Sequence, residues 1–234
     1  MENRDTFETP FERNAEASYA RSVFMKKTYV NLAFAIVAFA VCEAFLLHWQ
    51  PAVELAQTMV SGRNWLVVLL VFMGISWLAS SWAVQPASVG KQYAGLYLYV
   101  LAESVVFLPL LILAEAIAPD TIGQAAILTL SLSGGITAYA FISGKNFSFL
   151  GSFLTMGFFV ALGIIVCALI FGFQLGLWFS VAMAVFAAIA LLYQTSAIIH
   201  QYRNDQYVAA ALGLFASIAM LFWYILQILL NNRR

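Results

Sequence analysis

The sequence of 234 residues contains few charged side chains. Asp, Glu, Lys and Arg make up 9% of it, against roughly 25% in ordinary soluble domains. Residues 1–27 hold ten of these charges, and only ten more are spread over the 203 residues from Thr28 to Leu230. Apolar residues account for 63% of the chain, so a soluble fold would lack the polar surface to cover its core. This composition is typical of an integral membrane protein.

Cysteine, histidine and net charge are also scarce, and each shortage excludes a function class. The formal net charge is zero, which gives no support for binding to nucleic acid. Cys42 and Cys167 both fall in apolar segments, which predicts buried thiols rather than a disulfide. His48 and His200 fall on opposite membrane faces in the topology given below, so we expect no shared metal. Because no lysine follows Lys145, the last helix has no Schiff-base lysine for retinal.

Local signatures of enzymes are missing as well. The sequence has no Gly-x-Ser-x-Gly run, no His-Glu-x-x-His run and no glycine-rich phosphate loop. We therefore expect a protein that is not an enzyme, with no cofactor and no metal site.

The uncharged runs predict the number of membrane spans. A helix rises about 1.5 Å per residue, so a hydrocarbon core of about 30 Å needs about 20 residues. The 57 residues from Asn146 to Tyr202 carry no charge, and two glycines predict a break at 172–176. Runs such as 66–72 do not alternate as barrel strands would. The expected fold is all-α, with seven transmembrane helices near 29–49, 64–84, 93–115, 121–143, 149–171, 176–199 and 207–230.

Lys and Arg in the short connections predict the orientation of the chain. With a cytosolic amino terminus, eight basic residues lie inside and three outside. The eight are Arg4, Arg13, Arg21, Lys26, Lys27, Lys91, Lys145 and Arg203, and the three are Arg63, Arg233 and Arg234. We therefore expect a cytosolic amino terminus and an extracytoplasmic carboxyl terminus. Residues 1–27 are expected to be a polar, unfolded cytosolic tail, and residues 28–232 the transmembrane domain, with only short connections.

Glu103 is the acidic residue placed deepest in a predicted span. It lies about ten residues into the third helix, hence about 15 Å deep. An ionised acid there costs on the order of 3 kcal/mol on insertion scales, so Glu103 should be neutral or partnered and face the interior. Two interpretations stay open: a protonated acid that hydrogen-bonds a neighbouring helix, or a proton- or cation-responsive group. Pro109 frees the carbonyl of Val105, which suits both. Glu43 and Glu115 lie near helix ends and rank lower.

Two motifs resemble a known family. Lys145-Asn146-Phe147-Ser148-Phe149-Leu150-Gly151 opens the fifth helix, and Tyr193-Gln194-Thr195-Ser196-Ala197-Ile198-Ile199-His200 closes the sixth. Together with the seven spans, they resemble the Bax inhibitor-1 family, and its bacterial YccA-like branch in particular. The resemblance implies six helices packed around a central seventh, Val208 to Leu230, in the bacterial inner membrane.

The resemblance also implies a functional site, from which this chain departs. Calcium-leak members use two aspartates, one late in helix six and one in helix seven, as a proton-sensitive latch. Gln194 and Ser217 stand at the matching positions, and neither side chain titrates in the physiological range. A latch of two carboxylates that share a proton is therefore excluded, although Gln194 and Ser217 can still hydrogen-bond. The candidate interior polar site is Glu103, Gln194 and Ser217, with Glu43, Glu115 and His200 ranked below.

The YccA-like branch implies a membrane protein that interacts with the membrane AAA protease FtsH, is slowly degraded by it, and so restrains it. Such a protease needs an initiation segment on the cytosolic side, and residues 1–27 are expected to offer one. The alternative function is a proton- or cation-responsive leak channel for calcium or protons, with Glu103 as the responsive group. The expected partners are membrane lipid, the protease and cations.

Overall fold

The computed structural model describes residues 10–61, 64–85 and 88–233, with side chains from Asn14 onward. All regular structure in these ranges is helical. The helices are α1 (Pro10–Leu46), α2 (Gln50–Val60), α3 (Asn64–Ala83), α4 (Val89–Ile117), α5 (Asp120–Ser143), α6 (Leu150–Phe171), α7 (Leu177–His200) and α8 (Tyr207–Asn231). Seven of them, all except α2, are long and apolar enough to cross a membrane. The prediction of an all-α protein with seven spans is confirmed.

The helix ends from α3 onward lie within a few residues of the predicted ones. The predicted break at 172–176 separates α6, which ends at Phe171, from α7, which begins at Leu177. Gly172 ends α6 with φ of 75°, and Gly144 ends α5 with φ of 58°. Both angles are left-handed and favour glycine after the last helical turn. The two glycines therefore give the chain sharp stops between spans.

The amino-terminal segment differs from the prediction. We expected the first helix at 29–49 after an unfolded tail, but α1 is one helix from Pro10 to Leu46. The expectation of an unfolded chain is wrong for residues 10–27, while residues 1–9 lie outside the described residues. Glu, Arg and Ala are good helix formers, and proline is well tolerated at the first helical position. The polar residues thus extend the first span instead of ending it.

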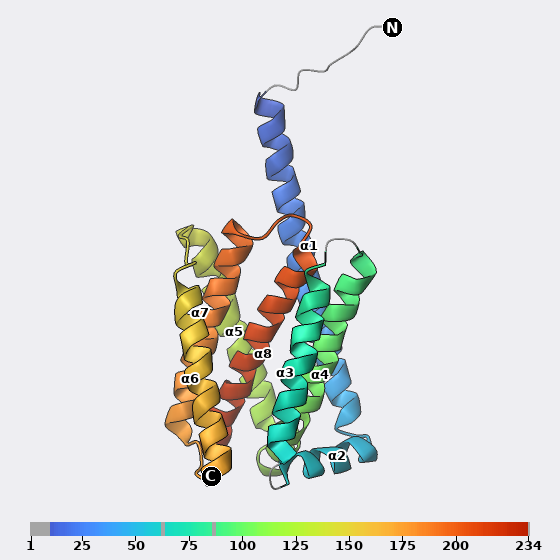
Figure 1. Cartoon of the computed structure of the whole chain (residues 1–234), viewed down its shortest axis with the longest axis vertical. Helices are drawn as coiled ribbons and strands as arrows, with labels where there is room; N and C mark the ends of the chain where they lie inside the picture. The colour runs from blue at the N-terminus through green and yellow to red at the C-terminus, as the bar shows by residue number, and fades with distance from the viewer. Residues whose placement is uncertain (1–9, 62–63, 86–87, 234) are drawn as a thin grey trace.

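The connection between the first two spans also holds a helix that the sequence did not suggest. Helix α2 lies across the end of the bundle opposite to the end from which α1 projects (Figure 1). Its buried residues Ala52, Ala56 and Met59 share one face, and the two alanines pack with Leu108 of α4. Helix α2 therefore closes that end of the bundle.

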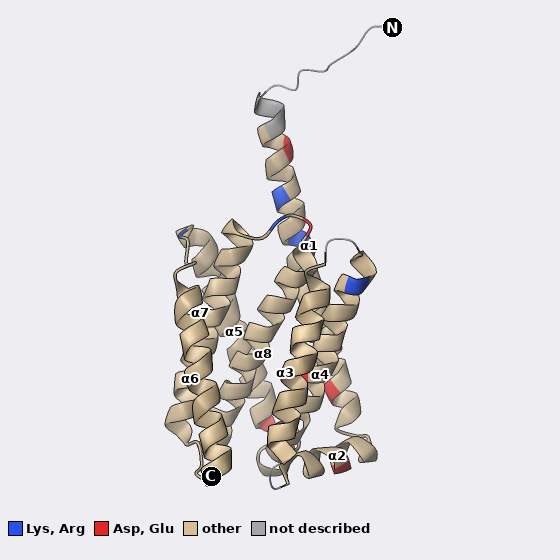
Figure 2. Cartoon of the chain, in the orientation of Figure 1, with Lys and Arg blue, Asp and Glu red and all other residues tan. Residues whose placement is uncertain are grey.

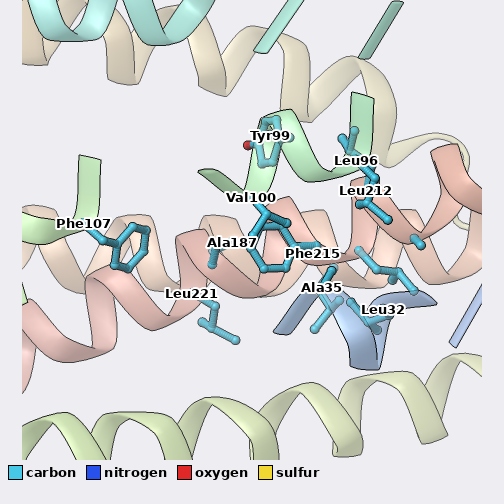
Figure 3. Packing of buried hydrophobic residues seen from close by; sticks show 14 of the residues in the cluster. Leu32, Ala35, Leu96, Tyr99, Val100, Phe107, Ala187, Leu212, Phe215 and Leu221 are labelled. Carbon is cyan, nitrogen blue, oxygen red and sulfur yellow. The ribbon is translucent and has the colours of Figure 1, made fainter. Parts of the chain in front are cut away.

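Helix α8 runs through the middle of the bundle, as predicted for the last span (Figure 1). It packs against α1, α4, α5 and α7 and touches α3. Figure 3 shows Phe215 and Leu221 of α8 among side chains of α1, α4 and α7. The ring of Phe39 on α1 meets the Phe215 ring edge-on, with centroids 5.8 Å apart. The core therefore surrounds a central helix.

Helices α3 and α4 approach closely because one residue between them has no side chain. A Cβ built on Gly95 of α4 would lie 2.4 Å from the carbonyl oxygen of Ala79 on α3. Small residues permit this kind of backbone contact in membranes, where apolar side chains gain nothing by leaving lipid. The outer faces are apolar instead, with Phe153, Met156 and Phe159 of α6 exposed.

Lys and Arg gather at the end of the bundle from which α1 projects, and the acidic residues lie mainly deeper (Figure 2). The first turn of α4 carries Lys91 there, and the turn between α5 and α6 carries Lys145. The loop between α7 and α8 adds Arg203. Of the basic residues that the sequence assigned to one membrane face, the structure thus brings together those whose side chains it describes, while Arg4 lies outside the described residues.

Candidate functional site

A groove of about 890 Å³ follows α8 along the bundle, walled by residues of α3, α4, α6 and α7. It extends from Tyr202, beside the basic end, to Asn231 at the other end of α8. All three residues of the predicted interior site, Glu103, Gln194 and Ser217, line it. Most other lining side chains are apolar. The structure therefore brings the predicted site residues to one cavity, though they come from three different helices.

Glu103 faces the interior of the bundle, as predicted, with 7% of its surface exposed. The hydroxyl of Tyr99 donates a hydrogen bond of 2.8 Å to Glu103 Oε1. Tyr99 lies one turn earlier on α4, so the partner of Glu103 in the described residues is on its own helix, and not on a neighbouring helix as the first of the two interpretations had it. The reason is geometric, since residues four apart on a helix lie side by side.

Glu43 is buried, which corrects its lower rank. Only 5% of its surface is exposed, and neither carboxylate oxygen has a hydrogen-bond partner in the described residues. We expected Glu43 to reach the membrane interface because it lies near the end of α1. Helix α2 packs beneath that end, against Leu46 and Leu47, and so covers it.

Gln194 and Ser217 each bond elsewhere rather than to each other. Ser217 Oγ donates to the carbonyl of Gly213, 3.0 Å away in its own helix. Gln194 Oε1 accepts a long hydrogen bond of 3.5 Å from the hydroxyl of Tyr202, whose pKa is raised by burial. Gln194 also packs on Gly213, where an added Cβ would lie 2.9 Å from its Cδ. The contact between α7 and α8 at this point depends on packing more than on a polar pair.

The remaining candidates lie outside the groove. Glu115 is exposed near the end of α4, and the exposed His200 sits at the end of α7 with Nδ1 3.1 Å from the carbonyl of Ser196. Cys42 is half-buried and Cys167 is exposed, both as free thiols. The prediction of a buried thiol is wrong for Cys167, because α6 buries only two residues and turns most of its surface outward. The described residues contain no cluster of three metal-ligating side chains.

The two motifs that resembled a family touch each other. The backbone N–H of Phe147 donates a hydrogen bond of 2.8 Å to Ser196 Oγ. A Cβ on Gly151 would lie 3.2 Å from the ring of Tyr193. The start of α6 is therefore fixed to the end of α7.

Arg21 of α1 binds the end of α7 and the loop that follows it, a contact that the sequence did not predict. Its guanidinium donates to the carbonyl of Tyr202 at 2.6 Å, to Asn204 Oδ1 at 3.2 Å and to the carbonyl of Ile198. The next turn of α1 adds Phe24, which is 1% exposed. Because the partners are mainly backbone atoms about 180 residues away, nothing in the sequence pattern could have identified the contact. The amino-terminal segment is thus anchored to the bundle from Arg21 onward.

The fold and the groove define a class: helical membrane proteins with seven spans, a central last helix and a mostly apolar internal groove. The profile of the family described as inhibitor of apoptosis-promoting Bax1 matches residues 21–234, and the chain belongs to this Bax inhibitor-1 family.

The chain is similar to proteins of a bacterium, a yeast and a virus. An uncharacterised protein of Pseudomonas aeruginosa is 39% identical over 112 residues, which cover 47% of this chain and 49% of that protein. Bax inhibitor 1 of Schizosaccharomyces pombe is 28% identical over 222 residues, which cover 91% of this chain and 78% of the relative. The Golgi anti-apoptotic protein of vaccinia virus strain Lister is 24% identical over 92% of this chain and 89% of its own length. The alignment with the Pseudomonas protein thus spans about half of that relative.

Proposed function

We propose that this protein is a non-enzymatic component of a bacterial inner membrane that engages a membrane AAA protease of the FtsH type, is slowly degraded by it, and thereby restrains it. The observation that carries the proposal is the projection of α1 beyond the bundle (Figure 1). Residues 14–20 are all exposed, and the hydrogen bonds that hold α1 to the bundle in the described part of the chain begin at Arg21. The resemblance to the YccA-like branch supports the choice of partner.

The projecting segment suits a protease that starts at a flexible or easily unwound end. Most of the stability of a helix in a protein comes from packing against its neighbours, and residues 14–20 at the free end of α1 are exposed, so these turns unwind at little cost. Resistance to unfolding by the protease begins at Arg21 and Phe24, where α1 joins the bundle. Extraction of each span beyond that point would expose its apolar surface to water, at a free-energy cost of about 25 cal/mol per Å². The protease would therefore engage the free end of α1 easily but degrade the bundle slowly, so the protein would occupy the protease for a long time.

The proposed orientation places the projecting end in the cytosol, where such a protease works. The described Lys and Arg residues gather mainly at that end (Figure 2), as the positive-inside rule expects for the cytosolic face. Seven spans then leave the carboxyl terminus on the extracytoplasmic side.

The test is the lifetime of the protein in cells with and without the protease. A variant that lacks residues 2–18 keeps Arg21 and Phe24, which hold α1 to the bundle, and Lys26 and Lys27, which set the orientation, so its bundle should stay folded. We expect this variant to outlive the full chain where the protease is present and to match it where the protease is absent. Equal lifetimes in all four cases would contradict the proposal.

A leak for protons or cations is the second candidate function. The observation that favours it is the convergence of Glu103, Gln194 and Ser217 on one groove. Flux in liposomes that contain only the purified protein tests it, with Glu103→Gln as the variant and Glu115→Gln as the matched control. A reproducible leak that Glu103→Gln alone abolishes supports this function, and the absence of any leak contradicts it.

A further inference from the structure

The groove contains one ionisable acid, Glu103, and no basic side chain among its described lining residues. Glu103 is the only Asp, Glu, Lys, Arg or His among its lining residues in the described part of the chain. Its partner Tyr99 is a neutral hydroxyl, and the ion pair that the described residues do form joins Arg203 to Asp205 in a loop. Glu43, the other buried acid of the described residues, does not line the groove and supplies no compensating cation. The groove therefore offers negative charge or a strong acceptor with no basic side chain to match it.

Aromatic rings line the same groove as this acid. The ring of Phe72 lies 5.9 Å from that of Tyr99, and the rings of Phe107 and Trp223 meet edge-on at 4.9 Å. Trp65 stacks on Trp223 at 6.4 Å, nearer the end of α8. All five residues line the groove. The face of an aromatic ring attracts a cation, and the attraction grows when water is excluded.

We infer that the groove is a binding site for lipophilic cations, molecules that carry one positive charge on an apolar or aromatic body. Glu103 supplies the counter-charge, and the aromatic residues receive the body of the ligand. The volume of about 890 Å³ falls within the range of small-molecule sites, about 300–1,000 Å³. This inference goes beyond the proposed function and does not depend on it.

Two other occupants fit the groove less well. A lipid acyl chain matches the apolar walls but leaves Glu103 without a counter-charge. A bare inorganic cation needs several oxygen ligands, and the described residues hold no cluster of three acidic, His or Cys side chains. Ser76, whose buried hydroxyl has no hydrogen-bond partner in the described residues, also lines the groove and can accept a polar group of the ligand. A cation with an apolar body can both pair with Glu103 and pack against the apolar walls of the groove.

Binding of tetraphenylphosphonium to the full-length protein in zwitterionic nanodiscs tests the inference, with empty nanodiscs to subtract partition into lipid. We expect saturable binding with one site per chain. Glu103→Gln should weaken the affinity at least tenfold, and Glu115→Gln, which removes an exposed acid from the same helix outside the groove, should leave it unchanged. Triphenylmethane, a neutral aromatic probe, should bind at least tenfold more weakly than the cation.

A second variant keeps the test decisive if Glu103→Gln perturbs folding. Trp65 is half-buried at one end of the groove, so Trp65→Leu should fold normally and weaken tetraphenylphosphonium binding at least threefold. Thermal unfolding of each variant verifies the fold. The inference is overturned if no saturable binding exceeds that of empty nanodiscs, if the neutral probe binds equally well, or if both substitutions leave the affinity unchanged.

Discussion

Replacing Arg21 by methionine should loosen the amino-terminal helix from the bundle. The last four carbonyls of a helix have no hydrogen-bond partner within it. Arg21 donates a hydrogen bond to one of these, the carbonyl of Ile198 at the end of α7. It also donates to the carbonyl of Tyr202, 2.6 Å away. Methionine keeps the length of the side-chain stem but removes every donor, so the loss of stability reports on these hydrogen bonds.

The expected loss is about 2 kcal/mol. A hydrogen bond from a charged donor contributes about 1.5–3 kcal/mol, and a cation at a helix carboxyl end about 0.3–1 kcal/mol. Arg21 is half-exposed, so water replaces part of the two carbonyl contacts and the sum falls toward the lower values. For a domain of this size, a change of about 2 kcal/mol lowers Tm by roughly 4–8 °C.

Thermal unfolding in detergent measures the loss, and Arg203→Met is the matched control. Arg203 donates hydrogen bonds of 3.1 and 2.7 Å to Asp205, which lower the pKa of that carboxyl, but both side chains are exposed. Exposed pairs contribute little, so this substitution should leave Tm almost unchanged. Hydrogen exchange in the loop 201–206 should accelerate only in Arg21→Met. Equal shifts for the two variants, or none for Arg21→Met, would refute the reasoning.

Three further predictions concern helix packing, the polar residues Gln194 and Ser217, and the topology of the chain. Gly95→Ala should cost more than about 3 kcal/mol by thermal unfolding, since its Cβ would overlap Ala79 O at 2.4 Å. Gly134→Ala, with no atom within 4 Å of the new Cβ, should be neutral or stabilise by up to about 1 kcal/mol; the reverse order would contradict the contact between α3 and α4. Gln194→Ala and Ser217→Ala should change stability and leave any transport in liposomes independent of pH, as in the parent; a pH response of the parent that either variant removes would overturn this. A reporter at the amino terminus should read as cytosolic and one at the carboxyl terminus as extracytoplasmic; the same reading at both ends would mean that one span is misassigned.

The membrane spans could be predicted from the sequence because their signal is local. About twenty predominantly apolar residues form a span wherever they occur, and Gly172 ends a helix through its own backbone freedom. The central place of the last span followed from family resemblance, not from local pattern. Helix α2 was missed because its 11 residues are too few to span a membrane and stand between two long apolar runs, where the sequence analysis expected only a short connection.

The site was predicted in part for the same physical reason. Glu103 was found because an acid at that depth is costly and therefore faces inward. Glu43 was ranked too low because its burial depends on α2, and the Arg21 contact was missed because it depends on a loop that is distant in sequence. The aromatic surroundings of the groove arise from side chains of different helices, such as Phe72 and Trp223, which no periodicity relates.

Degradation by the purified protease tests the central claim most directly. The full chain and the variant without residues 2–18 are reconstituted separately with an FtsH-type protease and ATP, together with a second, rapidly degraded substrate. We predict that the full chain is degraded slowly and slows turnover of the second substrate, and that the truncated variant does neither. Contradiction would come from a full chain that leaves turnover of the second substrate unchanged, or from a truncated variant that restrains the protease as strongly as the full chain.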